Sequence, residues 1–190
     1  MVAGLHSWWF ENHSFCASQR VVFNQNTVSW EQNILQRIDE DQTMPRALRI
    51  RQATAADAAD LARLNRLFDQ GEIPVGLIAE QLVRCQGVET AYLAEYEEAI
   101  VGFACLRLAP TLFSAEPYAE LTELFVEKEY RRLGIGAALM EHVEAVARQA
   151  GASELFLMTG FKNTNAHHFY HASGYSLRCL VMWRELMGNE

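Results

Sequence analysis

Apolar residues recur along the chain in two spacings, and each spacing predicts a different kind of element. At residues 48–51 they alternate with arginines, which indicates a strand with one buried face. Further on, Leu61, Leu64 and Phe68 stand three and four residues apart, which places them on one side of a helix. Thr54 precedes that helix and is expected to cap its N-terminus.

The middle of the chain continues with a second short helix and three strands. Apolar residues at helical spacing predict the helix at 76–84. The pair Glu97-Glu98 separates the first two strands and predicts a hairpin turn. The runs rich in β-branched and aromatic residues predict strands at 90–95, 100–108 and 118–126.

The last part of the chain alternates helices and strands. Ile135, Leu139 and Val143 form the buried stripe of a helix expected at 133–149. The remaining predicted elements are a strand at 155–158, a helix at 166–172 and a strand at 175–185. Four antiparallel strands, a crossover helix and then a parallel strand predict an α/β fold with a mixed sheet.

Composition narrows the class of protein. The chain has 190 residues, half of them hydrophobic, which is typical of a globular domain. Its formal net charge of −8 argues against nucleic-acid binding, and it suits either a cationic substrate or simple solubility. There is no run of 18 apolar residues and no basic segment leading into an apolar one at the N-terminus, so we expect neither a membrane span nor a signal peptide.

The four cysteines add little chemistry. They lack Cys-x-x-Cys spacing, so no zinc or redox motif follows. Cys85, Cys105 and Cys179 stand in apolar segments and are expected to be small buried residues. Free cysteines of this kind favour a cytoplasmic location over secretion.

Directly before the predicted crossover helix lies a turn with the composition of an anion site. Gly134 and Gly136 carry no Cβ, so a ligand can approach the backbone where helix N–H groups lack partners. Arg131 and Arg132 add positive charge in a planar form that suits phosphate. Alone, such a glycine pair is equally compatible with a plain turn. It matches neither a P-loop nor the three-glycine dinucleotide fingerprint.

Two segments together resemble the GNAT superfamily of N-acetyltransferases. Arg131-x-x-Gly134-x-Gly136 is similar to the family's acetyl-CoA signature, and residues 163–175 are similar to its later Asn-x-x-Ala-x-x-Phe-Tyr segment. The resemblance covers about residues 47–186, and it implies the GNAT fold and acetyl-CoA as cosubstrate. The coenzyme-binding residues that it implies are Leu124, Phe125, Val126, Arg131, Arg132, Leu133, Gly134, Ile135, Gly136, Ala137, Asn163 and Phe169.

Acetyl transfer to an amine needs a base for the amine proton and an acid for the leaving thiolate. Glu120 and Glu123 are the candidate bases. Their odd separation puts them on opposite faces of a regular strand, so both reach one cleft only if the strand carries a bulge. The resemblance implies such a bulge, and it implies Tyr170 as the general acid. Thr122 stands where polyamine-type members carry their base, which leaves the identity of the base open.

Further assignments concern the oxyanion and the helix at 166–172. The backbone N–H of Phe125 or Val126 is the expected oxyanion donor. Asn165 is expected to cap the helix, while Asn163 contacts the pantetheine or caps the helix itself.

Histidines on the same helix do not predict a metal site. His167 and His171 are four residues apart and share a helix face. However, no glutamate follows the first histidine as in His-Glu-x-x-His, and no third ligand is near, so we expect no metal.

The resemblance implies a small-molecule amine as acceptor, with aminoglycoside-type aminosugars or polyamines favoured. A protein N-terminus or lysine is the alternative acceptor, and a non-catalytic CoA sensor is the alternative class of protein. The residues expected to wall the acceptor pocket are Phe68, Phe113 and Tyr118, and those expected to attract a cation are Asp69, Glu72 and Glu116.

Residues 1–43 fall outside the resemblance, and the acetyltransferase domain is expected at 44–190. The extension is rich in aromatic residues, which is unusual for a disordered tail. A short amphipathic helix is expected at 29–38. Either the extension packs on the domain or on a partner subunit, which leaves a homodimer open, or the ordinary domain begins at Met44.

Overall fold

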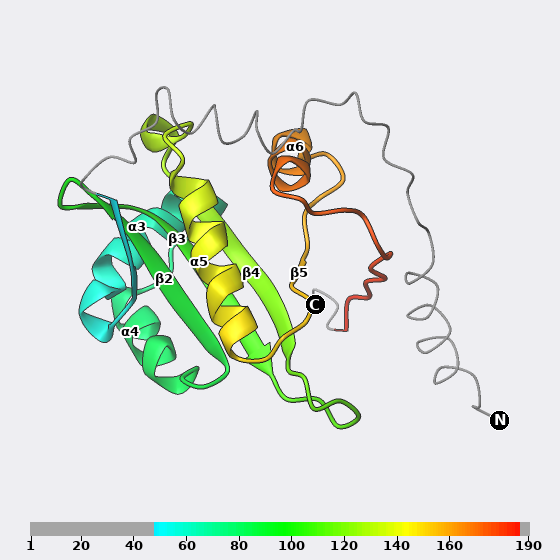
Figure 1. Ribbon diagram of the computed structural model, residues 1–190. Coiled ribbons are helices and arrows are strands. Elements are labelled where there is room, and N and C mark those ends of the chain that lie inside the picture. Colours follow the sequence, from blue (N-terminus) through cyan, green and yellow to red (C-terminus); the bar gives the residue numbers. More distant parts are fainter. Residues whose placement is uncertain (1–47, 187–190) are drawn as a thin grey trace, which may run out of the picture. The chain divides into compact units, whose positions relative to one another are not determined.

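The computed structural model describes residues 48–186 of the chain. In that range the elements follow in the order β1, η2, α3, α4, β2, β3, β4, η3, α5, β5 and α6 (Figure 1). The elements η2 (Ala55–Asp57) and η3 (Lys128–Tyr130) are single turns of 3-10 helix. The extension expected at 1–43, its helix at 29–38 and the domain boundary at residue 44 lie outside the described residues. None of the described helices is both long and apolar enough to cross a membrane.

The described strands form one mixed sheet whose spatial order is the order of the chain. Antiparallel pairs join the first four strands, and β5 lies parallel to β4, which confirms the predicted α/β class and its crossover. The turn between β2 and β3 falls at Glu97 and Glu98, as expected. The strands are β1 (Leu48–Gln52), β2 (Glu89–Tyr96), β3 (Ala99–Ala109), β4 (Tyr118–Val126) and β5 (Phe156–Leu157).

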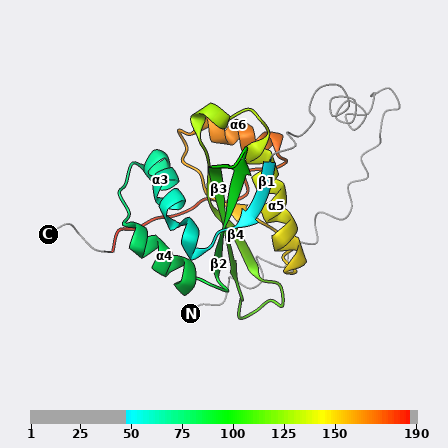
Figure 2. The ribbon, with the colours of Figure 1, turned by 90° about the vertical axis from the view of Figure 1, so that its left-hand side faces the viewer.

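Helices cover both faces of the sheet (Figure 2). On one face lies α5 (Ile135–Gln149), with Leu139 and Val143 buried in the core that it forms with the sheet. On the other face lie α3 (Ala58–Asp69) and α4 (Val75–Arg84), and a second core joins side chains of α3 to Phe103 and Phe125 of the sheet. The predicted helices at 76–84 and 133–149 are confirmed, although α5 begins two residues later than expected.

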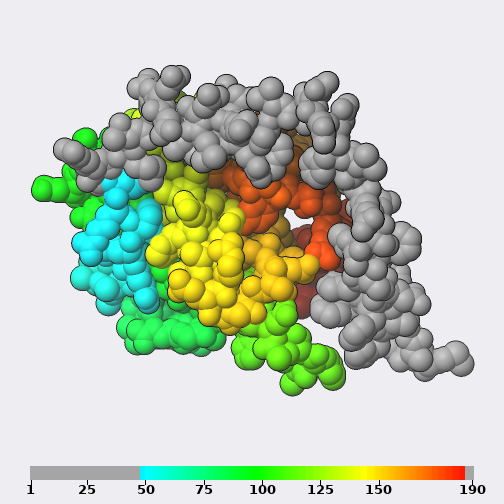
Figure 3. Space-filling view, viewed as in Figure 1, coloured from blue at the N-terminus to red at the C-terminus, as the bar shows by residue number. Residues whose placement is uncertain are grey.

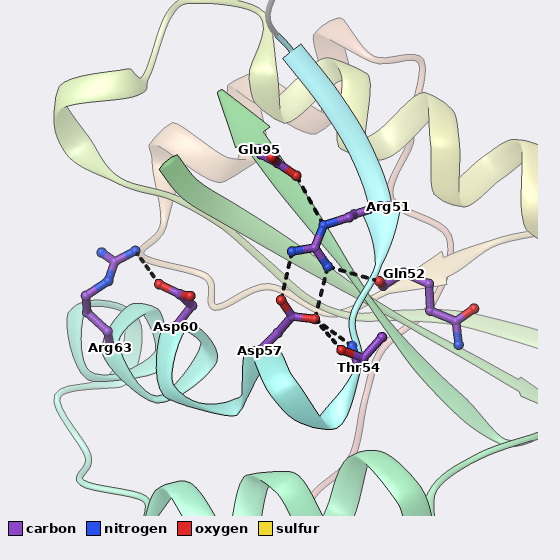
Figure 4. Close-up of polar contacts among 7 residues, drawn as sticks. All are labelled: Arg51, Gln52, Thr54, Asp57, Asp60, Arg63 and Glu95. Carbon is purple, nitrogen blue, oxygen red and sulfur yellow. Dashed lines mark hydrogen bonds and ion pairs between the residues drawn. The ribbon is translucent and has the colours of Figure 1, made fainter. Parts of the chain in front are cut away.

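Arg51 ties β1 to the sheet and to the start of α3 (Figure 4). Its two terminal nitrogens donate to the carboxylate of Asp57 over 2.7 and 3.0 Å, and its Nε donates to Glu95 over 3.2 Å. Asp57 also accepts hydrogen bonds from the backbone N–H and the hydroxyl of Thr54, both over 2.8 Å. The Arg51 guanidinium therefore holds the pKa of Asp57 well below its usual range. Thr54 caps the short turn η2 through a capping box with Asp57, whereas the N-cap of α3 itself is Asp57 and not Thr54 as expected.

The strand expected at 175–185 does not form. The segment has no regular structure, and the apolar side chains of Leu177, Met182 and Trp183 are exposed. Cys179, which was expected to be buried, is exposed as well. An apolar composition indicates only that a segment suits a strand, whereas pairing also needs a neighbouring edge with free N–H and C=O groups. At two residues, β5 offers too short an edge.

Candidate active site

A bulge in β4 decides where the two candidate bases point. The register between β3 and β4 slips by one residue between Cys105 and Leu106, and Thr122 of β4 is the residue left over. The extra residue resets the alternation of side chains. Glu120 and Glu123 consequently lie on the same face of the sheet, the face covered by α3 and α4, and the expected bulge is present.

Glu123 borders a cavity of about 300 Å³ between that face and the two helices, which we call the acceptor cavity. Its Oε2 lies 3.8 Å from the Sγ of Cys105, which donates to it. Burial, and next the negative charge of Glu89, raise the pKa of Glu123 above its ordinary value. The residues that line the acceptor cavity are Leu61, Asn65, Ile73, Leu77, Ile78, Gln81, Leu82, Cys85, Glu89, Ala91, Phe103, Cys105 and Glu123.

Glu120 has a different environment, although it shares the face. It is 6% exposed and accepts a hydrogen bond from Arg107 over 3.1 Å. The same guanidinium donates to Glu89 over 3.1 Å, and Glu89 also accepts from the hydroxyl of Thr122 over 2.6 Å. The charge of Glu120 is thus compensated inside a network, and Glu120 does not border the acceptor cavity. Of the two carboxylates, Glu123 is the one that faces space for a substrate.

No motif points to Glu89 or Arg107. The available signal is Arg107 itself, because a lone arginine in the apolar run at 100–108 needs a carboxylate partner once the strand is covered. Its partners could not be identified from the sequence, since they depend on the register of three strands.

Beyond the bulge, β4 and β5 diverge. β5 pairs with β4 only through Glu120 and Leu121. Within the described residues, the edge of β4 that faces β5 therefore has no strand beside it from Thr122 to Val126. An unpaired edge presents N–H and C=O groups to any extended molecule that enters. The positions expected to hold pantetheine, Leu124, Phe125 and Val126, lie along this stretch.

The loop at 127–134, which contains the predicted anion site, follows the open edge. It ends at Gly134, whose φ of 80° is in the left-handed region. The N–H of Ala138 donates to the carbonyl of Gly134 over 3.0 Å, so the amides of residues 134–137 precede the first bond of the helix. A Cβ at Gly134 would meet nothing within 4 Å, so this glycine serves backbone conformation and not space. At Gly136 a Cβ would lie 3.5 Å from the ring of Phe169, so α6 packs close to the loop.

The two arginines of the loop differ in what they contact. Arg131 donates from Nε to the carbonyl of Val126 over 2.8 Å, and its guanidinium carbon lies 5.7 Å from the centre of the Phe125 ring. Arg132 is exposed and has a φ of 70°. Arg131 therefore places positive charge where the open edge meets the loop, as an anionic ligand of that region would require.

Residues 56–175 match the family described as "Acetyltransferase (GNAT) family". The chain belongs to the GNAT acetyltransferases. The resemblance inferred from Arg131 to Gly136 and from residues 163–175 is thereby confirmed, and this GNAT chain is an acyltransferase.

The relatives of this GNAT chain are named for different acceptors. It is 33% identical over 131 residues to an aminoglycoside N(6')-acetyltransferase type 1 from Stenotrophomonas maltophilia, a match that covers 66% of the chain and 84% of the relative. It is 34% identical over 127 residues to an amino-acid acetyltransferase from Pseudomonas putida, covering 67% of the chain but only 27% of that protein.

The solved structure of the aminoglycoside N-acetyltransferase AAC(6')-Iy in complex with CoA has the same fold. It superposes with a TM-score of 0.65 at 18% identity, covering 74% of this chain and 95% of that one.

In this GNAT chain, α6 (Thr164–Ala172) carries the candidate general acid. Tyr170 is half-buried, with its ring centre 5.3 Å from that of Phe169 and 6.0 Å from that of Tyr175. Burial raises the pKa of Tyr170 above the ordinary value of a phenol, which is itself well above neutral. Asn163 caps the helix, because its side chain accepts from the N–H of Ala166 over 3.2 Å. The cap assigned to Asn165 is therefore wrong, because the helix begins before that residue.

The three aromatic residues expected around the substrate are not brought together. Phe68 packs with its ring centre 5.7 Å from that of Phe125, at the edge of the second core. Tyr118 stacks on Phe156, with ring centres 5.3 Å apart. Phe113 is 87% exposed on the loop at 110–117, which projects beyond the sheet (Figures 1 and 3). None of the three borders the acceptor cavity.

Of the charged candidates, Asp69 is exposed and near enough to Glu123 for its charge to help raise the pKa of that carboxyl, whereas Glu72, Glu116 and two histidines have local contacts. Glu72 lies 3.7 Å from Arg66, and Glu116 accepts from the hydroxyl of Ser153. His167 Nε2 lies 3.1 Å from the carbonyl of Gly160, and His171 Nδ1 lies 2.9 Å from the carbonyl of Tyr175. These two histidines connect α6 to the segments on either side of it.

Proposed function

We propose that this GNAT chain transfers the acetyl group of acetyl-CoA to the primary amine of a small molecule, with Glu123 as general base and Tyr170 as general acid. The observation that carries the proposal is the place of Glu123. Its side chain borders the acceptor cavity, and its backbone belongs to the open edge from Thr122 to Val126, which leads along the chain to the amides of residues 134–137.

The residues present fit coenzyme A. Amides at the start of α5 and the charge of Arg131 and Arg132 suit its pyrophosphate. The open edge from Thr122 to Val126 suits its pantetheine arm, which carries two amides. When bound, acetyl-CoA supplies a thioester whose carbonyl carbon forms a bond to the amine nitrogen while the carbon–sulfur bond breaks.

The chain itself moves the protons. Glu123 accepts a proton from the ammonium group, directly or through a water, because only the neutral amine has a lone pair for attack. The raised pKa of Glu123 makes it a stronger base than an ordinary glutamate. An N–H of the open edge at Phe125 or Val126 would stabilise the developing oxyanion. Tyr170 donates its proton to the departing sulfur and recovers one from solvent, while the second amine proton leaves with solvent.

The experiment compares Glu123→Gln with Glu120→Gln, with acetyl-CoA and a panel of amines, by following free thiol. Glu123→Gln should lower kcat/KM by about 10²–10⁴-fold while leaving CoA binding intact, since general base catalysis typically contributes that much. The rate of the native chain should rise with pH through a midpoint above that of an ordinary glutamate, and this rise should vanish in Glu123→Gln. If Glu120→Gln loses the pH-dependent rise instead, the assignment of the base is wrong.

A further inference from the structure

The wall of the acceptor cavity is mainly apolar. Of its thirteen lining residues, seven are aliphatic or aromatic and two are cysteines. A hydroxyl or amine pressed against such a wall loses its hydrogen bonds to water without gaining others. An aminosugar or polyamine carries polar groups along its whole length, so most of its surface is poorly matched to this wall.

The charge in the cavity is concentrated at one carboxylate. Both oxygens of Glu89 are engaged, one by Thr122 and the other by Arg107. Glu123 has the weak thiol donor of Cys105 at 3.8 Å. One open carboxylate suits one ammonium group. No lysine or arginine is among the described residues that line the cavity, and the neighbouring guanidinium of Arg107 is already paired with Glu89 and Glu120, so a carboxylate on the acceptor would be poorly compensated.

The helix above the cavity has an apolar side that the protein buries only in part, through Ile78 and Leu82. Within α4 no residue is buried, although apolar residues stand at helical spacing on the side toward the sheet. Leu77, which borders the cavity, is 43% exposed. The cavity volume of about 300 Å³ is at the lower end for small-molecule sites. An apolar body of one or two rings would cover these side chains.

Resting on the proposed function, we infer that the acceptor is a primary monoamine with an apolar body and no carboxylate, such as an arylalkylamine. Its ammonium group lies at Glu123 and its body lies beneath α4, against Leu77 and Phe103. Leu77 is then a specificity-determining residue, and the single charge of the ligand matches the single open carboxylate.

The test compares four acceptors on the full chain: 2-phenylethylamine, phenylalanine, an aminoglycoside and spermidine. Phenylalanine is the matched control, because it adds only a carboxylate to the same body. We expect kcat/KM for 2-phenylethylamine to exceed that for each of the others by about 100-fold, as expected when an unpaired charge or hydroxyls enter an apolar pocket. A higher kcat/KM for the aminoglycoside, spermidine or phenylalanine overturns the inference.

Two variants on α4 locate the body of the acceptor. Leu77→Gln should raise KM for 2-phenylethylamine about tenfold with kcat unchanged, because it removes apolar contact in ground and transition states alike. Val83→Gln is the control, since Val83 is on the same helix, is 58% exposed and does not border the cavity. An equal effect of the two variants overturns the placement beneath α4.

Calorimetric binding separates this inference from the proposed function. Suppose that 2-phenylethylamine binds the native chain and binds the Leu77→Gln variant more weakly, yet no amine releases thiol. The acetyl-transfer proposal then fails and the ligand class stands. If another amine is acetylated and 2-phenylethylamine neither binds nor reacts, the ligand class fails and the acetyl-transfer proposal stands.

Discussion

The two faces of the sheet are covered by amphipathic helices, yet only one face is closed. Beneath α5, Leu139 and Val143 are fully buried. Beneath α4 lies the acceptor cavity, and that helix has no buried residue. An apolar stripe therefore predicts which side of a helix faces the sheet, but not whether the space between them is filled. The closed face is a filled core, and the open face contains the cavity that we propose holds the acceptor.

Truncation on the closed face should produce the largest loss of stability. Leu139→Ala should lower the free energy of unfolding by about 3 kcal/mol, because it leaves a cavity in a filled core. Leu77→Ala, the same change on α4, should lower it by less than about 1 kcal/mol, because Leu77 is partly exposed and already borders empty space. Urea denaturation measures both, and similar losses would contradict the difference between the faces.

Asp57 should stabilise α3, on the open face, more than it stabilises α5. Asp57→Asn weakens the Arg51 contacts that fix the start of α3, and should lower stability by about 2 kcal/mol. Hydrogen exchange should accelerate in α3 more than in α5. Acceleration of equal size in both helices would mean that the contacts between Arg51 and Asp57 stabilise the whole domain.

The same carboxylate predicts a dependence of stability on pH. Its folded pKa lies below its unfolded value of about 3.9, so its contribution is fully present above that pH and is lost as pH falls through the folded pKa. Acid unfolding of Asp57→Asn should therefore lack part of the loss of stability seen in the native chain below about pH 4.

The smallest effect should fall on the loop that precedes α5, which we propose binds the pyrophosphate of coenzyme A. Gly134→Val places a β-branched residue at a φ of 80°, and the strain of about 1–2 kcal/mol should weaken CoA binding about tenfold. Gly134→Asn should lose less, since asparagine tolerates the left-handed region. Calorimetry with CoA measures both. Equal losses would indicate that space at Gly134, and not its backbone, matters.

Local signals predicted most of the fold. The strand at 118–126 and the stripe through Leu139 and Val143 depend on neighbours in sequence, and both were found where the pattern placed them. The strand at 175–185 was wrong because pairing depends on an edge that β5 does not provide.

The site was less predictable from sequence. Motifs located the loop and Tyr170, and the family resemblance implied the bulge that brings Glu120 and Glu123 to one face. The separation of their environments could not be predicted. It depends on Arg107 reaching Glu120 and Glu89, which is a matter of register across three strands. The aromatic candidates Phe113 and Tyr118 were chosen for residue type, and type alone does not determine which way a loop projects.

The position of Thr122 in the bulge determines which mutations β4 can tolerate there. Its side chain contributes one hydrogen bond to Glu89, so many replacements there would leave the strand intact. Its presence as an extra residue, however, sets the orientation of everything before it in β4. Loss of this one codon would turn Glu120 toward α5 and bring Ala119 and Leu121 to the opposite face. At this position a substitution should therefore be tolerated better than a deletion.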